Sequence, residues 1–377
     1  MILKKEKKKE KNYKINKYLF IYFIFTLIIG VVSAIFILQS VAFNQIKSKS
    51  LDLFSKGGRY EYLYLPNIAI EAIKSNFYKL EKINLEIKFD NLLILENIRN
   101  NAIKEGSLPG SNLNTKVNFK LIYNNKKYPG EIRLKGDRKV HYVDKEKSSY
   151  KIELDKENYI FGASKFSLQK PRLRNYVHEW IFHQMAKDFN IIKIRYEFLE
   201  LSINGESKEL YVLEEGFGKE LIERNKRRNG PIFGLNEELN VDSNNPVFEI
   251  YNKKYWAKDE NKALVENASQ KLRDFFNKKV VLEDIFDIEK WAAYFAIVDM
   301  TSTYHGAFLK SVKLYYNPIN GLFEPIPYDG HRLKPNYHKY NKNYDHRLLF
   351  DIVSEPKNYD ETKDLKWLKK FLWSVYG

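Results

Sequence analysis

The feature that most limits how this chain can fold is an uncharged apolar run over residues 18–43. Leucine, isoleucine, phenylalanine and valine dominate the run, and no Asp, Glu, Lys or Arg interrupts it. A helix that rises about 1.5 Å per residue would carry a run of this length across a hydrocarbon core about 30 Å thick. The run therefore predicts one N-terminal transmembrane helix. A cleaved signal peptide is the alternative, although the apolar segment of a signal peptide is usually shorter.

Positive charge is concentrated before this run. The first 17 residues contain eight lysines and two glutamates, in a chain with a formal net charge of +16. Because positively charged flanks usually stay on the cytoplasmic side of a membrane, we expect residues 1–17 to form a basic cytoplasmic tail. Residues 18–43 would then span the cell membrane once, residues 44–64 would be a juxtamembrane spacer, and the body, residues 65–377, would be extracytoplasmic.

Composition places the body among folded globular proteins. The chain has 377 residues, of which 44% are hydrophobic and 15% aromatic, so it can bury a full core and a disordered chain is excluded. It contains no cysteine, which excludes disulfides, thiolate metal sites and a cysteine nucleophile. The basic charge suits an anionic partner. We expect no nucleic acid, since neither a groove-reading basic helix nor a zinc pattern is present.

Hydrophobic periodicity predicts short antiparallel hairpins and helices within one α+β body. The expected strands are residues 83–89, 116–122, 130–134, 149–154, 198–203, 209–213, 312–317 and 322–326. The expected helices are residues 92–104, 175–189, 259–276 and 282–295. Asn204-Gly205 is the expected turn of one hairpin, because both residue types accept the positive φ that a two-residue turn requires.

Charged side chains stand between these apolar runs and indicate a site for a charged ligand. Arg133 belongs to the stretch RLKGD, and Arg172 and Arg174 come just before the helix expected at residues 175–189. Guanidinium groups bind phosphate with two parallel hydrogen bonds, and a helix N-terminus favours anions. These arginines are therefore candidate phosphate ligands. A brace between Arg133 and Asp137 across the hairpin is the structural alternative.

Several of these stretches follow one another as they do in a known family. They are RLKGD (133–137), SSYKIEL (148–154), KFSLQKPRLRNY (165–176), KRRNGPI (226–232) and HGAFLKSVKLYYNPINGLFEPIPYDG (305–330). Across about residues 85–335 the chain resembles CotH proteins, and it looks like their membrane-anchored bacterial branch. CotH proteins are atypical protein-kinase-like enzymes known for spore-coat phosphorylation. The resemblance implies a protein-kinase-like body behind the transmembrane helix, with ATP and Mg²⁺ as cofactors.

The resemblance also implies roles for individual residues. Lys151 would be the lysine that contacts the nucleotide phosphates, and Glu215 its ion-pair partner. The adjacent Glu214 is the alternative partner, because two neighbours on a strand point to opposite faces. Asp329 follows an apolar strand and precedes Gly330, like the metal-binding aspartate of kinase-like sites. An aspartate that only caps a turn is the structural alternative for Asp329.

The expected catalytic loop departs from the family's pattern, which places an aspartate a few residues before a metal-binding asparagine. Ser311 takes the asparagine's position here, and a serine hydroxyl is a weaker metal ligand than an amide carbonyl. The catalytic residue itself would be Asp299 or His305. A histidine can act as a general base near neutral pH, but a hydrogen-bonded structural histidine is the alternative.

We therefore expect a membrane-anchored CotH-like kinase that transfers the ATP γ-phosphoryl group to a hydroxyl of a cell-envelope protein or polymer. One alternative is a catalytically inactive scaffold that binds an anionic envelope ligand. Another is an anchored carbohydrate-binding protein whose tyrosines stack on sugars. Members of this branch usually continue past the equivalent of Gly377, so we expect the kinase-fold domain at residues 65–377 to be C-terminally incomplete.

Overall fold

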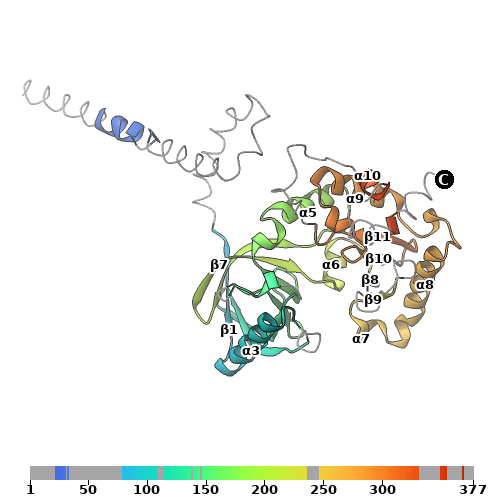
Figure 1. Cartoon of the computed structure of the whole chain (residues 1–377), viewed down its shortest axis with the longest axis horizontal. Coiled ribbons are helices and arrows are strands. Elements are labelled where there is room, and N and C mark those ends of the chain that lie inside the picture. The colour runs from blue at the N-terminus through green and yellow to red at the C-terminus, as the bar shows by residue number, and fades with distance from the viewer. Residues whose placement is uncertain are drawn as a thin grey trace, which may run out of the picture. The chain divides into compact units, whose positions relative to one another are not determined.

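The computed structural model describes part of the chain. The described residues are 22–30, 32–33, 79–108, 114–136, 139–144, 147–235, 246–330, 349–354 and 367–368. The chain divides into two compact units, residues 1–78 and 79–377. In the first unit the described residues are helical and solvent-exposed. The second unit holds the described strands and the remaining helices (Figure 1).

Seven strands of the second unit form a closed barrel in the order β1-β2-β3-β4-β5-β7-β6. Their bounds are β1 Glu81–Glu86, β2 Val117–Tyr123, β3 Lys126–Leu134, β4 Tyr150–Leu154, β5 Lys165–Gln169, β6 Tyr196–Ile203 and β7 Glu206–Glu215. Neighbouring strands run antiparallel except β1 and β6, whose parallel pairing closes the barrel. The helix α3 (Phe89–Glu105) adds Leu95, Ile98 and Ala102 to the barrel core.

Alternation along the strands separates the two faces of the barrel wall. In β2, Val117, Phe119 and Leu121 are buried, whereas the intervening Asn118 and Lys120 are exposed. Successive strand residues point to opposite faces, so an alternating sequence places its apolar residues inside the barrel. Across β3, β4, β5 and β7 the opposite, outward face carries polar side chains, and these form the site described below.

A second sheet and several helices surround another core. The sheet has the order β11-β10-β8-β9, with β8 Ile232–Leu235, β9 Phe248–Ile250, β10 Lys313–Asn317 and β11 Leu322–Ile326. The helices are α5 His178–Asp188, α6 Lys219–Arg224, α7 Lys253–Trp256, α8 Asp259–Phe276, α9 Ile288–Thr301 and α10 Leu349–Ser354, with the 3₁₀ turns η4 Pro171–Arg174 and η6 Tyr304–Ala307. Phe182 of α5, Trp291 and Tyr294 of α9 and Phe323 of β11 meet in this core.

Local sequence explains where helix α9 begins and which face of helix α8 is buried. The carboxylate of Asp287 accepts a hydrogen bond from the backbone N–H of Lys290 at 3.3 Å, which caps the N-terminus of α9. Along α8, Ala268, Leu272 and Phe275 recur at helical spacing and are buried. Both helices therefore form because one stripe of each is apolar and packs on the second sheet's core.

The chain passes from the barrel to the second sheet through the end of β7. After Glu215 it continues through Gly216-Phe217-Gly218 into α6 and then β8. The connection from β5 to β6 runs through η4 and α5, and α5 packs in the second core through Phe182 and Ala186. Residues of β7, η4 and α5 consequently lie where the barrel meets the helical part.

The fold predicted from the sequence, an α+β kinase-like body of antiparallel hairpins and helices behind one N-terminal transmembrane helix, is wrong. Seven strands close into a barrel through a parallel pair, and among the described residues no helix is both long and apolar enough to cross a membrane. Residues 18–21, 31 and 34–43 of the predicted span lie outside the described residues. The predicted tail, residues 1–17, and the predicted spacer, residues 44–64, lie outside them as well.

Many individual elements are nevertheless confirmed. The helix predicted at residues 259–276 coincides with α8, and the hairpin predicted at 312–317 and 322–326 is β10 and β11. Asn204 and Gly205 have φ angles of 51° and 83°, as the predicted turn between β6 and β7 requires. The helix predicted at 175–189 begins later, at His178, because η4 and a left-handed Asn175 precede it.

Candidate functional site

One row of side chains crosses the outer face of the barrel. The strand registers pair Arg133 with Lys151, Lys151 with Ser167, Ser167 with Glu214, and Glu214 with Tyr196. Residues paired directly across neighbouring strands project to the same face. The row therefore gathers cations from β3 and β4 and a carboxylate from β7 on one surface.

Lys135 joins this row just past the end of β3. Its Nζ lies 2.5 Å from Oε2 of Glu214 and donates to Oε1 of Gln169 at 3.0 Å. The Gln169 amide in turn donates to Oε1 of Glu214 at 3.2 Å. Burial alone would raise the pKa of Glu214, but Lys135 and Arg174 outweigh it, so the pKa of this carboxyl is lowered. The result is a buried and hydrogen-bonded lysine–carboxylate pair held in one position.

Arg174 connects this pair to Asp329. The arginine ends η4 and is buried. Its Nη1 lies 2.7 Å from Oδ1 of Asp329, and its Nε lies 3.8 Å from Oε1 of Glu214. Burial alone would lower the pKa of Arg174, but the charges of Asp329, Glu214 and Glu179 raise it. The guanidinium group therefore stays charged and links two carboxylates from β7 and from the segment after β11.

Asp329 is held at a sharp turn. Its φ is 57°, in the left-handed region that few non-glycine residues occupy. At the next position a Cβ on Gly330 would lie 2.3 Å from Cδ1 of Phe182, so only glycine fits against this core side chain. The Asp329-Gly330 pair thus turns the chain tightly against α5 and aims the carboxylate at Arg174.

His305 and Ser311 complete the surroundings of Asp329. Nδ1 of His305 lies 3.1 Å from the backbone oxygen of Asp329 and 3.2 Å from its Oδ2. The Ser311 hydroxyl lies 3.1 Å from the same nitrogen. Tyr294 donates to the carbonyl of Gly306 at 2.6 Å and so fixes η6, which carries His305. His305 therefore contacts Oδ2 of Asp329, while Arg174 contacts Oδ1.

Four of the residues predicted from the sequence therefore meet in one cluster: Arg174, His305, Ser311 and Asp329. Arg133 and Lys151 lie on the adjoining row of the barrel face. The Lys151 side chain reaches solvent, yet partial desolvation and then the Arg133 and Lys135 cations lower its pKa to about 8. The roles assigned to these residues stay predictions.

The other three predicted residues lie elsewhere. Glu215 projects to the opposite face from Glu214, where it is paired with Arg224 and accepts from the backbone N–H of Arg195 at 2.9 Å. Arg172 is exposed. The Asp299 carboxylate accepts from the backbone N–H of Leu349 at 2.6 Å, at the start of α10. The structure does not bring Lys151 and Glu215 together as an ion pair.

Sequence reasoning missed Lys135 and Gln169 and gave Glu214 only as an alternative. A usable signal was present in β7, where Leu213 lies in the barrel core. Because strand residues alternate between faces, an inward Leu213 places Glu214 on the outer face. Lys135 was within the quoted RLKGD stretch, but nothing in the sequence shows that it lies opposite β7.

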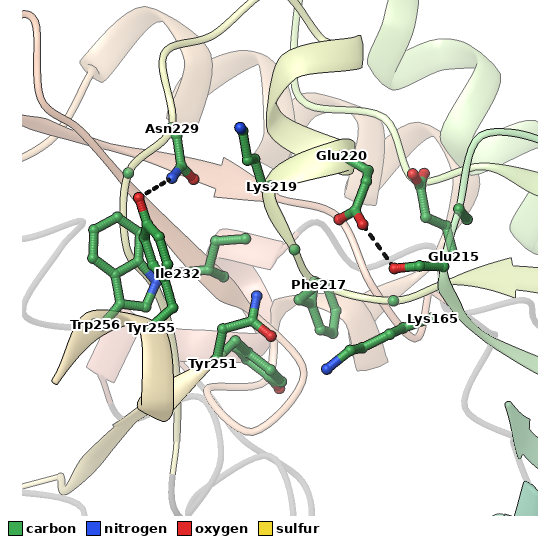
Figure 2. Close-up of a pocket in the computed structure, with 16 residues that line it drawn as sticks. Lys165, Glu215, Phe217, Lys219, Glu220, Asn229, Ile232, Tyr251, Tyr255 and Trp256 are labelled. Carbon is green, nitrogen blue, oxygen red and sulfur yellow. Dashed lines mark hydrogen bonds between the residues drawn. The ribbon is translucent and has the colours of Figure 1, made fainter. Parts of the chain in front are cut away.

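A pocket of about 200 Å³ lies beside the connection that leaves β7 (Figure 2). Its lining includes Gly216-Phe217-Gly218 and the aromatic side chains of Tyr251, Tyr255 and Trp256. Figure 2 shows Tyr255 and Trp256 on the opposite side of the pocket from Lys165. The Phe217 ring lies 4.6 Å from the Tyr251 ring and 5.1 Å from that of Tyr328, the residue before Asp329. The pocket therefore adjoins the polar cluster.

The described residues hold no group of three His, Cys, Asp or Glu side chains that could bind a metal ion by themselves. Mg²⁺ in nucleotide sites is usually held by one or two carboxylates together with substrate phosphates and water. Asp329 supplies one such carboxylate, beside the cationic row. These residues fit a divalent cation that arrives with a nucleotide, and they do not form a metal site of their own.

A buried lysine–carboxylate pair beside an aspartate after a strand is the arrangement of a kinase-related nucleotide site. A family model described as CotH kinase protein matches residues 132–373. That is more than half of the chain, so the chain belongs to the CotH kinase protein family. No curated protein matches the chain. Membership supports a CotH-like, kinase-related function and, in general terms, the use of ATP and a metal; it does not confirm the membrane-anchored branch.

Proposed function

We propose that this chain binds ATP with a divalent cation and transfers the γ-phosphoryl group to a hydroxyl of a protein or polymer. The observation that carries the proposal is the continuous series of contacts from Lys135 through Glu214 and Arg174 to Asp329. Phosphoryl transfer needs little covalent chemistry from a protein, because positioning and charge stabilisation do most of the work. Those four side chains supply both.

The phosphates would lie along the outer face of the barrel. Lys135 is fixed by Glu214, and Arg133 and Lys151 project from the same face. These three cations suit a triphosphate, since charged hydrogen bonds to phosphate are about twice as strong as neutral ones. In this arrangement Lys135 takes the role that the family resemblance implied for Lys151, and Lys151 becomes a second phosphate ligand.

The nucleobase would lie in the pocket beside Gly216-Phe217-Gly218. Its aromatic lining, Tyr251, Tyr255 and Trp256, suits a flat ring, because every base presents a π-face to an aromatic side chain. The contact between Phe217 and Tyr328 places this pocket next to Asp329. One nucleotide could thus place its base in the pocket and its phosphates beside Lys135.

Asp329 would hold the divalent cation, which when bound neutralises charge on the phosphates. His305 contacts both the carboxylate and the backbone oxygen of Asp329, which supports an orienting role for the imidazole. Ser311 contacts the same imidazole nitrogen. The proposed roles of His305 as a general base and of Ser311 as a metal ligand stay predictions. So do the cell-envelope acceptor and the extracytoplasmic location.

A nucleotide-binding scaffold without transferase activity is the second candidate. It is favoured by the position of Asp299, whose carboxylate caps α10 at Leu349. The aspartate predicted as catalytic thus makes a structural contact with the start of α10. A scaffold of this kind would bind ATP through the same cations but would not move the phosphoryl group.

Incubation of the full chain with Mg²⁺, γ-labelled ATP and dephosphorylated casein tests the proposal. We expect label on the chain or on casein, and its loss in Asp329→Asn. ATP binding without transfer in the wild-type chain would select the scaffold. Absence of ATP binding would overturn both candidates.

A further inference from the structure

Ser167 is a member of the row across the outer face of the barrel, and the proposed site gives it no role. In β5 it pairs directly with Lys151 of β4 on one side and with Glu214 of β7 on the other. The Cβ atoms of residues paired in this way lie about 5 Å apart on the same face. The Ser167 side chain therefore lies between a proposed phosphate ligand and the carboxylate that fixes Lys135.

The neighbours of Ser167 along β5 fix the direction of its side chain. Phe166 and Leu168 both lie in the barrel core. Because successive strand residues point to opposite faces, Ser167 points outward. It is nonetheless buried, with 6% of its surface exposed. The row thus places a small polar side chain where little water reaches it.

The hydroxyl of Ser167 has no hydrogen-bond partner within the described ranges of the chain. The polar groups near it are satisfied without it, since Lys135, Gln169 and Glu214 bond to one another. A buried hydroxyl without a partner costs free energy. The Ser167 oxygen is not fully enclosed by protein atoms, so a ligand on the outer face can reach it.

The charges beside Ser167 define the chemistry of that ligand. Lys151 is next to Ser167 in the row, and Arg133 is next to Lys151. On the other side, Glu214 is already paired with Lys135. The cations attract an anion, and a serine hydroxyl can donate one hydrogen bond to it. A phosphate oxygen fits this combination, because it accepts from a hydroxyl and from an ammonium group alike.

We propose that Ser167 donates a hydrogen bond to the phosphate chain of the bound nucleotide and so helps to select the triphosphate over the nucleoside. The bond acts together with the charge of Lys151, its neighbour in the row. This inference rests on the proposed function in taking the outer face of the barrel as the phosphate site. A serine that only separates Lys151 from Glu214 as a small spacer is the structural alternative.

Calorimetric titrations of the full chain with ATP and Mg²⁺, with inorganic tripolyphosphate and with adenosine separate the two roles. In Ser167→Ala we expect ATP and tripolyphosphate each to bind about tenfold more weakly, as for the loss of a hydrogen bond to a charged group. Adenosine binding should not change, because adenosine has no phosphate. Ser167→Thr keeps the hydroxyl and should bind both phosphate ligands like wild type. A spacer predicts the reverse order, with affinity kept by the small alanine and lowered by the larger threonine.

Ser202→Ala is the matched control. Ser202 lies further along β6 than Tyr196, the member of the row on that strand, and its hydroxyl donates to the backbone oxygen of Ile83 at 3.3 Å. We expect unchanged affinity for all three ligands in this variant. Wild-type affinity for ATP and tripolyphosphate in Ser167→Ala, or an equal loss for adenosine, would overturn the inference and leave the proposed function standing. A wild-type chain that binds neither ATP nor tripolyphosphate would overturn the proposed function, and the inference with it.

Discussion

Lys135 and Glu214 form a buried ion pair, with Nζ and Oε2 2.5 Å apart, that ties the end of β3 to β7 on the outer face of the barrel. The pair lies beside Arg174, which reaches Asp329 from the other side. Two cations and two carboxylates thus alternate across the junction between barrel and helices. This alternation keeps the buried charges compensated and leaves Lys135 in a fixed position.

Removal of the Glu214 charge should destabilise the fold. In Glu214→Gln both Lys135 and Arg174 lose their shared carboxylate, and breaking a buried pair costs about 3 kcal/mol. Urea unfolding of the full chain measures the loss. Glu153→Gln is the control, because its pairs with Lys116 and Lys165 are on the surface and are worth about 0.5 kcal/mol. Equal losses in the two variants would contradict the account.

The same carboxylate predicts a loss of stability in acid. The pKa of Glu214 is lowered in the folded chain relative to its ordinary value of 4.5. Its contribution is therefore present above the pKa of the unfolded chain and is lost as the pH falls through the lower folded value. Unfolding free energies of wild type and Glu214→Gln should converge below pH 4.5. A constant difference down to the lowest pH at which the chain stays folded would argue against this origin.

ATP affinity should fall between about pH 7 and pH 9, because Lys151, with a pKa of about 8, loses its charge there. A neutral amine attracts phosphate less than an ammonium group does. Lys151→Arg keeps its charge and should bind ATP with a flatter pH profile, measured by calorimetry over this range. Parallel profiles for wild type and Lys151→Arg would place Lys151 outside the phosphate site.

Substitution of the two aspartates predicted from the sequence should affect phosphoryl transfer differently. Asp329→Asn should abolish phosphoryl transfer, since Asp329 adjoins Arg174 and His305. Asp299→Asn should keep most of the transfer activity, because an amide oxygen can still accept from the Leu349 N–H. Label incorporation from γ-labelled ATP compares them. Loss of transfer in folded Asp299→Asn would restore the catalytic role first predicted for that residue.

Removal of an aromatic side chain from the pocket should weaken the binding of nucleotides but not the binding of free polyphosphate. Tyr255 lines the pocket and is 40% exposed, so its truncation should leave the fold intact. Loss of one stacking contact costs about 1–3 kcal/mol, and Tyr255→Ala should weaken ATP binding by a similar amount. Calorimetry with inorganic tripolyphosphate should show no change. Weakening of both ligands would mean that the pocket does not hold the base.

Several elements could be predicted because their patterns are local. The alternation of β2 and the helical spacing of α8 each lie within fewer than 20 residues. Closure of the barrel could not be predicted, because β1 pairs in parallel with β6, which lies more than 100 residues further along the chain. No local pattern states which two strands meet at such a separation.

For the site, too, only the features that depend on local sequence could be predicted. Asp329 was predictable because it follows β11 and precedes Gly330, both features of the local sequence. The choice of Lys135 over Lys151 as the buried lysine depends on which one lies opposite Glu214 and Gln169. That depends on how the ends of β3 and β7 pack together. Each lysine belongs to one of the family's motifs, Lys135 to RLKGD and Lys151 to SSYKIEL, and only their burial distinguishes them.

The most direct measurement is the ATP affinity of the full chain in the presence of Mg²⁺, compared between wild type and Lys135→Met by calorimetry. Lys151→Met serves as the comparison within the same row of cations. The account predicts that Lys135→Met binds ATP at least about tenfold more weakly, a loss of about 1.4 kcal/mol, and that Lys151→Met loses less. Equal affinity in wild type and folded Lys135→Met would contradict the assignment of this cluster as the nucleotide site.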